Sequence, residues 1–227
     1  MDNLNENPQI VELIDTLDKN GLMKEKNEVQ SLVKYIGDME ETLTGMLGEL
    51  QDMRREINLI HNSSLRSKCQ NLVQKTENKI RQGFSAVKMM KDNLIKSAGD
   101  TMRAFREKGK DTLAESIRAM KIPVFFDKLS AMFHKLSNEM AQDTMKLSSM
   151  QSELRSAKGH LKNMGLLFIG KAVKEAEHTK TDKGVLSRLS RLFEKAQQGF
   201  ASLEQKAMDI ADKLRVARVK VSVKENL

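Results

Sequence analysis

The feature that most constrains the fold is a long apolar seam near the start of the chain. Between Val29 and Ile60, an apolar residue recurs at alternating steps of three and four without interruption. This spacing is typical of a helix that packs along one stripe against other helices, as in a coiled coil. Gly37, Gly45 and Gly48 weaken this helix intrinsically and permit either close helix contact or local flexibility. The seam residues to which we assign a role in assembly are Val29, Leu32, Ile36, Met39, Leu43, Leu50 and Ile57.

Two further seams have the same spacing and cover residues 126–164 and 186–217. Asp143 is the one polar residue in them. It lies either at the edge of a packing face that has drifted slightly, which we favour, or in the seam itself, where pairing with a Lys or Arg would fix the register. The assembly residues of these seams are Phe126, Phe133, Leu136, Leu147, Leu154, Leu189, Phe193, Phe200, Leu203 and Ile210.

A different amphipathic helix is expected between the first two seams. From Leu65 to Phe105 the apolar positions recur at a mean step of about 3.6 residues, which indicates a straight helix. The same segment is rich in Lys and Arg. If the segment docks on the acidic first seam, the pattern is ordinary core packing; if it is left free, the cations fit an anionic membrane or nucleic acid. The residues of this possible anion-binding face are Lys75, Lys79, Arg81, Lys88, Lys96, Arg103 and Arg106.

The composition favours an all-α fold. Helix-forming residues dominate, whereas the chain has only 2 Pro, one Tyr and no Trp, and it lacks the β-branched and aromatic runs of a sheet. Short connections between long helices favour antiparallel neighbours. We therefore predict an all-α, elongated antiparallel helical bundle with coiled-coil packing.

Turn residues divide the chain into segments. Asn7 and Pro8 predict a helix start and Asn20-Gly21 its end, Gly99 and Gly109 are candidate breaks, and Asp111 is a candidate cap. We also expect turns at 61–64 and 121–123, a buried corner at 165–170 and a loop at 178–182. The predicted parts are a short N-terminal helix at 1–21, the acidic heptad helix with the basic helix at 22–121, two heptad helices at 122–217, and a frayed tail at 218–227.

The net charge of +8 is unevenly distributed along the chain. Residues 1–65 carry a net charge of −7, residues 66–121 carry +8 and residues 122–227 carry +7. Helices of opposite sign can pack side by side and neutralise each other, which is the interpretation we favour. The alternative is an exposed basic face for nucleic acid or an anionic membrane.

No sequence pattern indicates catalysis. The chain contains no glycine-rich phosphate loop and no metalloprotease motif, and its four histidines are far apart in sequence. Cys69 lies on the apolar stripe, where a packing role is expected, and a single cysteine excludes an intrachain disulfide. We expect no enzyme activity, cofactor, metal or small-molecule substrate, and a cytoplasmic location because no signal peptide or membrane span is apparent.

Three segments carry a resemblance to a known family. They are residues 27–82, MKIPVFFDKL at 120–129 and DKGVLSRL at 182–189. With them the chain resembles an uncharacterised family of helical proteins from gut Firmicutes that is associated with mobile genetic elements, a domain of unknown function. The resemblance implies a cytoplasmic bacterial protein that assists the maintenance or transfer of such elements, and it implies no catalytic or binding residue.

The expected function is therefore a non-enzymatic scaffold or protein–protein interaction role, with a protein partner or self-association through the seams. The alternative is a module that binds an anionic membrane or nucleic acid through the basic helix at 66–121.

Overall fold

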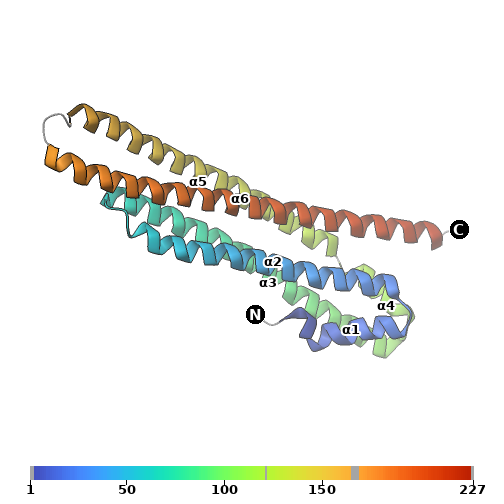
Figure 1. The fold of residues 1–227 in the computed structure, drawn as a ribbon. Coiled ribbons are helices and arrows are strands. Elements are labelled where there is room, and N and C mark those ends of the chain that lie inside the picture. The colour runs from blue at the N-terminus through green and yellow to red at the C-terminus, as the bar shows by residue number, and fades with distance from the viewer. Residues whose placement is uncertain (1–2, 121, 165–168, 226–227) are drawn as a thin grey trace. The chain divides into compact units, whose positions relative to one another are not determined.

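The computed structural model describes residues 3–120, 122–164 and 169–225, with side chains placed for 3–120, 122–156 and 180–215. Within these residues the chain is an all-α helical bundle, as predicted, and Figure 1 shows its helices in chain order from blue to red. The elements are η1 (Leu4–Glu6), α1 (Pro8–Lys19), α2 (Met23–Ile57), α3 (Ser63–Lys108), α4 (Asp111–Ala119), α5 (Ile122–Met164) and α6 (Ile169–Glu225).

The predicted boundaries of the first helix are confirmed. The Asn7 side chain accepts hydrogen bonds from the backbone N–H groups of Gln9, at 3.1 Å, and Ile10, at 3.4 Å, so it caps α1. Gly21 ends the helix with a φ of +72°, a conformation that glycine adopts without steric cost.

The break predicted at Gly109 is also confirmed, with a φ of +84°, but the break at Gly99 is not, because α3 continues through it. The prediction that Asp111 caps α4 was wrong. Lys110 is the cap residue and makes no side-chain capping bond, and Asp111 lies in the first turn instead. There its negative charge faces the positive end of the helix dipole.

The C-terminal third differs most from expectation. The loop predicted at 178–182 is absent, because α6 runs without interruption from Ile169 to Glu225. The segment 171–183 is polar but contains neither Pro nor Gly, so its composition does not interrupt a helix. The helical backbone also covers most of the segment expected to fray from residue 218. Most of the corner predicted at 165–170 lies outside the described residues.

The helices form two compact units, and each long helix contributes a segment to both. Unit 1 comprises residues 1–43, 83–133 and 202–227, and unit 2 comprises residues 44–82 and 134–201. Each unit thus combines segments that are distant in sequence, whereas the sequence-based division followed consecutive ranges.

In unit 2 each of four helix segments runs antiparallel to two neighbours. Contacts join α2 to α3, α3 to α5, α5 to α6, and α6 back to α2, and in every case a later residue of one helix meets an earlier residue of the other. The pairs that show this are Arg54–Glu77 and Asn58–Gln70, Lys68–Glu153 and Lys79–Asp143, Gln151–Leu186 and Ser137–Gln197, and Glu49–Lys195 and Glu56–Arg188.

The three predicted seams supply a large part of the core, together with the apolar residues of α1, α3 and α4. Of the 17 assembly residues, only Leu154 and Ile210 are half-buried, and the other 15 are buried. Phe126 and Phe133 anchor unit 1, while Phe193 and Phe200 anchor unit 2, all with no exposed surface. Burying a large apolar side chain contributes roughly 1.5–3 kcal/mol, so these positions hold the bundle together. Coiled-coil packing in the strict sense stays a prediction.

In the described part of the chain, no helix combines the length and apolar character that a membrane crossing requires.

Candidate interaction surface

The two units differ sharply in charge. Unit 1 contains 20 Lys and Arg residues against 20 Asp and Glu residues, and therefore has no net charge. Unit 2 contains 19 against 11, and therefore carries the entire net charge of +8. The excess of cations belongs to one half of the fold rather than to one stretch of sequence.

The predicted anion-binding face of α3 is divided between the units. Lys75, Lys79 and Arg81 belong to unit 2, and the other four residues, Lys88, Lys96, Arg103 and Arg106, belong to unit 1. Six of the seven are exposed. Lys79 is the exception, with only 9 % of its surface exposed, so its inclusion in an exposed face was wrong.

Ion pairs engage three of the six exposed cations. Arg81 pairs with Glu77 within α3, Arg103 pairs with Asp100, and Arg106 pairs with Glu12 of α1. The cations that have no ion-pair partner among the described residues are Lys75, Lys88 and Lys96.

The acidic first seam and the basic helix do pack together in unit 1. Lys91 of α3 is buried, and its ammonium group donates to both carboxylate oxygens of Glu40 in α2, at 3.2 and 3.3 Å. This contact is the neutralisation between oppositely charged helices that the charge pattern predicted.

The single polar seam residue is the centre of a buried charge cluster in unit 2. Asp143 has 2 % of its surface exposed, and its carboxylate accepts hydrogen bonds from Lys79 at 2.5 Å and Lys146 at 3.1 Å. The favoured interpretation, that Asp143 lies at the edge of the packing face, was therefore wrong. The alternative, a polar seam residue paired with a Lys, agrees with these contacts.

The environment of Asp143 acts on its pKa in two opposing ways. Burial raises the pKa, because it removes the carboxylate from water, but the hydrogen bonds and positive charges of Lys79 and Lys146 outweigh this effect. The pKa of Asp143 is lowered below its ordinary value, so the carboxylate is ionised at neutral pH. Glu139 extends the cluster, with one carboxylate oxygen 3.8 Å from the Lys79 ammonium and the other 4.0 Å from that of Lys135.

The sequence carried a weak signal for this pair. Lys79 flanks the apolar stripe of α3, and antiparallel packing of α3 on α5 brings residue 79 level with residue 143, while Lys68 reaches Glu153 in the same register. The register between α3 and α5 could not be assigned from the sequence, because the sequence does not show which helices are neighbours.

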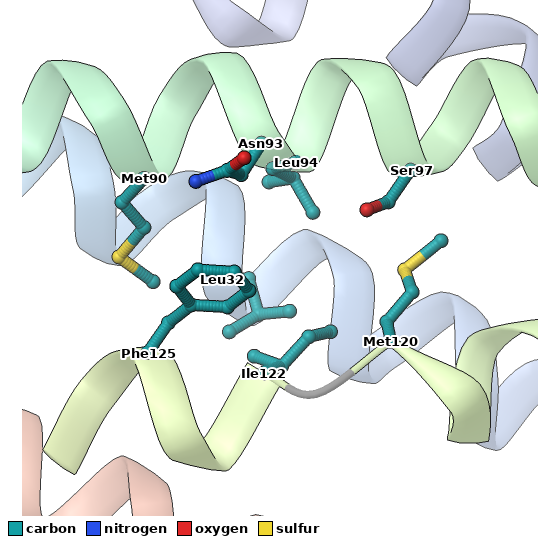
Figure 2. Close-up of a pocket in the computed structure, with 8 residues that line it drawn as sticks. All are labelled: Leu32, Met90, Asn93, Leu94, Ser97, Met120, Ile122 and Phe125. Carbon is teal, nitrogen blue, oxygen red and sulfur yellow. The ribbon is translucent and has the colours of Figure 1, made fainter. Parts of the chain in front are cut away.

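A small apolar cavity lies in unit 1, where α2, α3, the end of α4 and the start of α5 meet. Figure 2 shows its lining side chains converging, with the ring of Phe125 facing Met90, Leu32 and Leu94. Its volume is about 20 Å³, room for roughly one water molecule. Asn93 and Ser97 provide the polar atoms. This cavity is too small for a cofactor or a metabolite.

Cys69 is buried in unit 2. Burial raises the pKa of its thiol to about 11, and the negative charge of Asp182 adds to the shift. The thiol therefore stays protonated at neutral pH and is a poor nucleophile, in agreement with the packing role predicted for it.

Two of the four histidines have described side chains. His61 lies in the turn between α2 and α3, and His134 lies in α5. No group of three His, Cys, Asp or Glu side chains in the described part of the chain is arranged to hold a metal ion.

Comparison with known proteins gives a family but no functional description. No curated protein and no protein of known structure shows a significant match to this chain. One family model matches residues 6–227, which is nearly the whole chain. The chain belongs to that family, which is described as a family of unknown function (DUF6674).

Proposed function

We propose that the protein is a non-enzymatic interaction protein that binds an acidic partner through unit 2. The observation that carries the proposal is the charge division, in which unit 1 is neutral and unit 2 carries +8. A concentrated positive field attracts polyanions and raises their rate of association. The seams that were candidates for self-association are largely buried within the chain, which favours a charged rather than an apolar contact surface.

The cations of unit 2 that have no ion-pair partner among the described residues provide this surface. They lie on α3, α5 and α6, and include the predicted residue Lys75. The others are Arg66, Arg155, Lys180, Lys183 and Arg191. Each adds to the positive potential, because none of them pairs with a carboxylate whose side chain the structure describes.

The experiment measures binding of the full chain to three acidic probes: a DNA duplex, vesicles containing phosphatidylserine, and polyglutamate. At least one probe should bind at about 50 mM salt and bind more weakly at about 200 mM, because electrostatic contacts are screened by salt. The test variant is K75Q/R191Q in unit 2, and the matched control is K88Q/K96Q in unit 1. Loss confined to the unit 2 variant is expected. Absence of binding to all three probes, or equal loss in both variants, would contradict the proposal.

The family resemblance supports a narrower role. A family from gut Firmicutes that is associated with mobile genetic elements suggests a bacterial, cytoplasmic protein that assists the maintenance or transfer of such elements. In such a role the acidic partner is either a protein or a nucleic acid, and the three probes distinguish between these two classes.

A further inference from the structure

We propose that the edge between α5 and α6 in unit 2 is a site for the phosphate backbone of duplex nucleic acid, formed by Arg155, Lys180 and Lys183. The inference rests on the proposed function and names the class of its partner.

The register of the two helices places these cations together. The Gln151 side chain of α5 donates to the backbone carbonyl of Leu186 in α6 at 3.1 Å, and Ser137 donates to that of Gln197 at 3.4 Å. These two contacts define the edge of α5 that faces α6 and show that the helices are antiparallel. Residues 137 and 151 are about four helical turns apart and therefore lie on the same edge.

Arg155 and Lys183 continue this edge in opposite directions along the chain. Arg155 follows Gln151 by one turn, and Lys183 precedes Leu186 by one turn, so an antiparallel pair brings them to the same level. Lys180 lies one further turn along α6. Arg155 and Lys180 are exposed, and Lys183 is half-buried.

Of the carboxylates whose side chains the structure describes, the three nearest in sequence to these cations have other partners. Glu153 faces Lys68 of α3 at 3.8 Å, and Glu194 accepts from Ser190 at 3.3 Å. Asp182 is buried and accepts from the backbone N–H of His61 at 3.0 Å. Three like charges that share an edge repel one another, and a bound polyanion would relieve that repulsion.

The kind of partner follows from what surrounds the cations. Contacts to a duplex backbone need Lys and Arg and little else, whereas protein interfaces rely on buried aromatic and apolar anchors. Stable membrane adsorption needs inserted apolar side chains next to the cations. In the described part of unit 2 the exposed large apolar residues are Leu59, in the α2–α3 turn, and Met145. Met145 lies more than two turns before Arg155 and off the edge that Gln151 defines.

Single-stranded nucleic acid fits less well than a duplex. Single strands are bound by stacking their bases on exposed aromatic rings. The phenylalanines of unit 2 whose side chains are described, Phe193 and Phe200, are both fully buried. Contacts of Lys and Arg to phosphates alone carry no base information, so binding should be independent of sequence.

The test compares two variants of the full-length chain. The test variant is R155Q/K183Q. The control is K206Q/K213Q, which removes the same number of positive charges from two exposed lysines of α6 in unit 1. Binding to a labelled duplex of about 20 base pairs is followed by fluorescence anisotropy over a salt series. Because each lost phosphate contact lowers the slope of log K against log salt by about 0.9, the slope of the first variant should fall by about 1.8. Its affinity should fall roughly tenfold, with an unchanged circular dichroism melt.

Two results would overturn this inference alone. One is equal loss of duplex binding in both variants. The other is a wild-type chain that leaves the duplex unbound while it binds vesicles or polyglutamate, and in that case the proposed function stands with a different partner. Failure to bind any of the three probes would contradict both this inference and the proposed function.

Discussion

At the scale of one residue, the buried Asp143 carboxylate constrains the core of unit 2. A buried ion pair gains little net stability over well-packed apolar residues, but removing one member leaves an uncompensated charge. D143A should therefore lower the free energy of unfolding by about 3–5 kcal/mol, because the buried Lys79 loses its hydrogen-bonded partner and keeps only Glu139, 3.8 Å away. The double variant K79M/D143L should recover most of that loss in urea unfolding at neutral pH. A double variant as unstable as D143A would show that the charges themselves are required.

The same pair predicts how stability depends on pH. The pKa of Asp143 is lower in the folded chain than in the unfolded one, so its contribution is fully present above the unfolded value of about 3.9. It is lost as the pH falls through the folded value. The difference in stability between wild type and D143A should therefore shrink below about pH 4 and stay constant above it.

At the scale of one element, helix α2 contains three glycines that have no neighbouring atoms where a side chain would lie. A Cβ added at Gly37, Gly45 or Gly48 meets no atom within 4 Å. Replacement of each by Ala should raise the free energy of unfolding by about 0.5–1 kcal/mol, because the helix loses less backbone entropy on folding. G83A and G199A are the controls. Their added Cβ would lie 3.1 Å from Leu43 Cδ2 and 3.0 Å from Met46 Sδ, so the gain should be cancelled or reversed. Equal stabilisation at all five sites would contradict this account.

The sequence predicted most features that depend on one helix, but it did not predict the specific contacts between helices. Heptad spacing is a property of one helix, and most of the seam positions that it assigned in α2, α5 and α6 and whose side chains are described are buried. The open space at Gly45 depends on which helices are neighbours, and spacing alone left close contact and flexibility as alternatives. The helix at 178–182 was missed because its polarity was taken for a turn signal. The Lys79–Asp143 pair required the register between α3 and α5, which a single sequence does not contain.

At the scale of the whole molecule, the burial of the seams predicts the state of association. Of the 17 assembly residues, 15 are buried within the chain and have almost no apolar surface for contact with a second copy. Light scattering at about 150 mM salt should therefore give a mass close to the 25.7 kDa of one chain, and added salt should not change it. A stable dimer would show that some other surface joins the copies. For the proposed surface site, the sequence predicted only an excess of positive charge. It did not predict that this charge gathers in unit 2, because unit 2 combines segments that are distant in sequence.

The division of four long helices between two units has a consequence for how this protein can be altered by genetic change. Each unit is assembled from separate stretches of the gene, and the chain passes from one unit to the other at residues 43/44, 82/83, 133/134 and 201/202, each time inside a continuous helix. No single truncation can release either half, and no single insertion point offers a flexible connection between them. Recombination can therefore exchange this protein as a whole far more easily than it can exchange its parts.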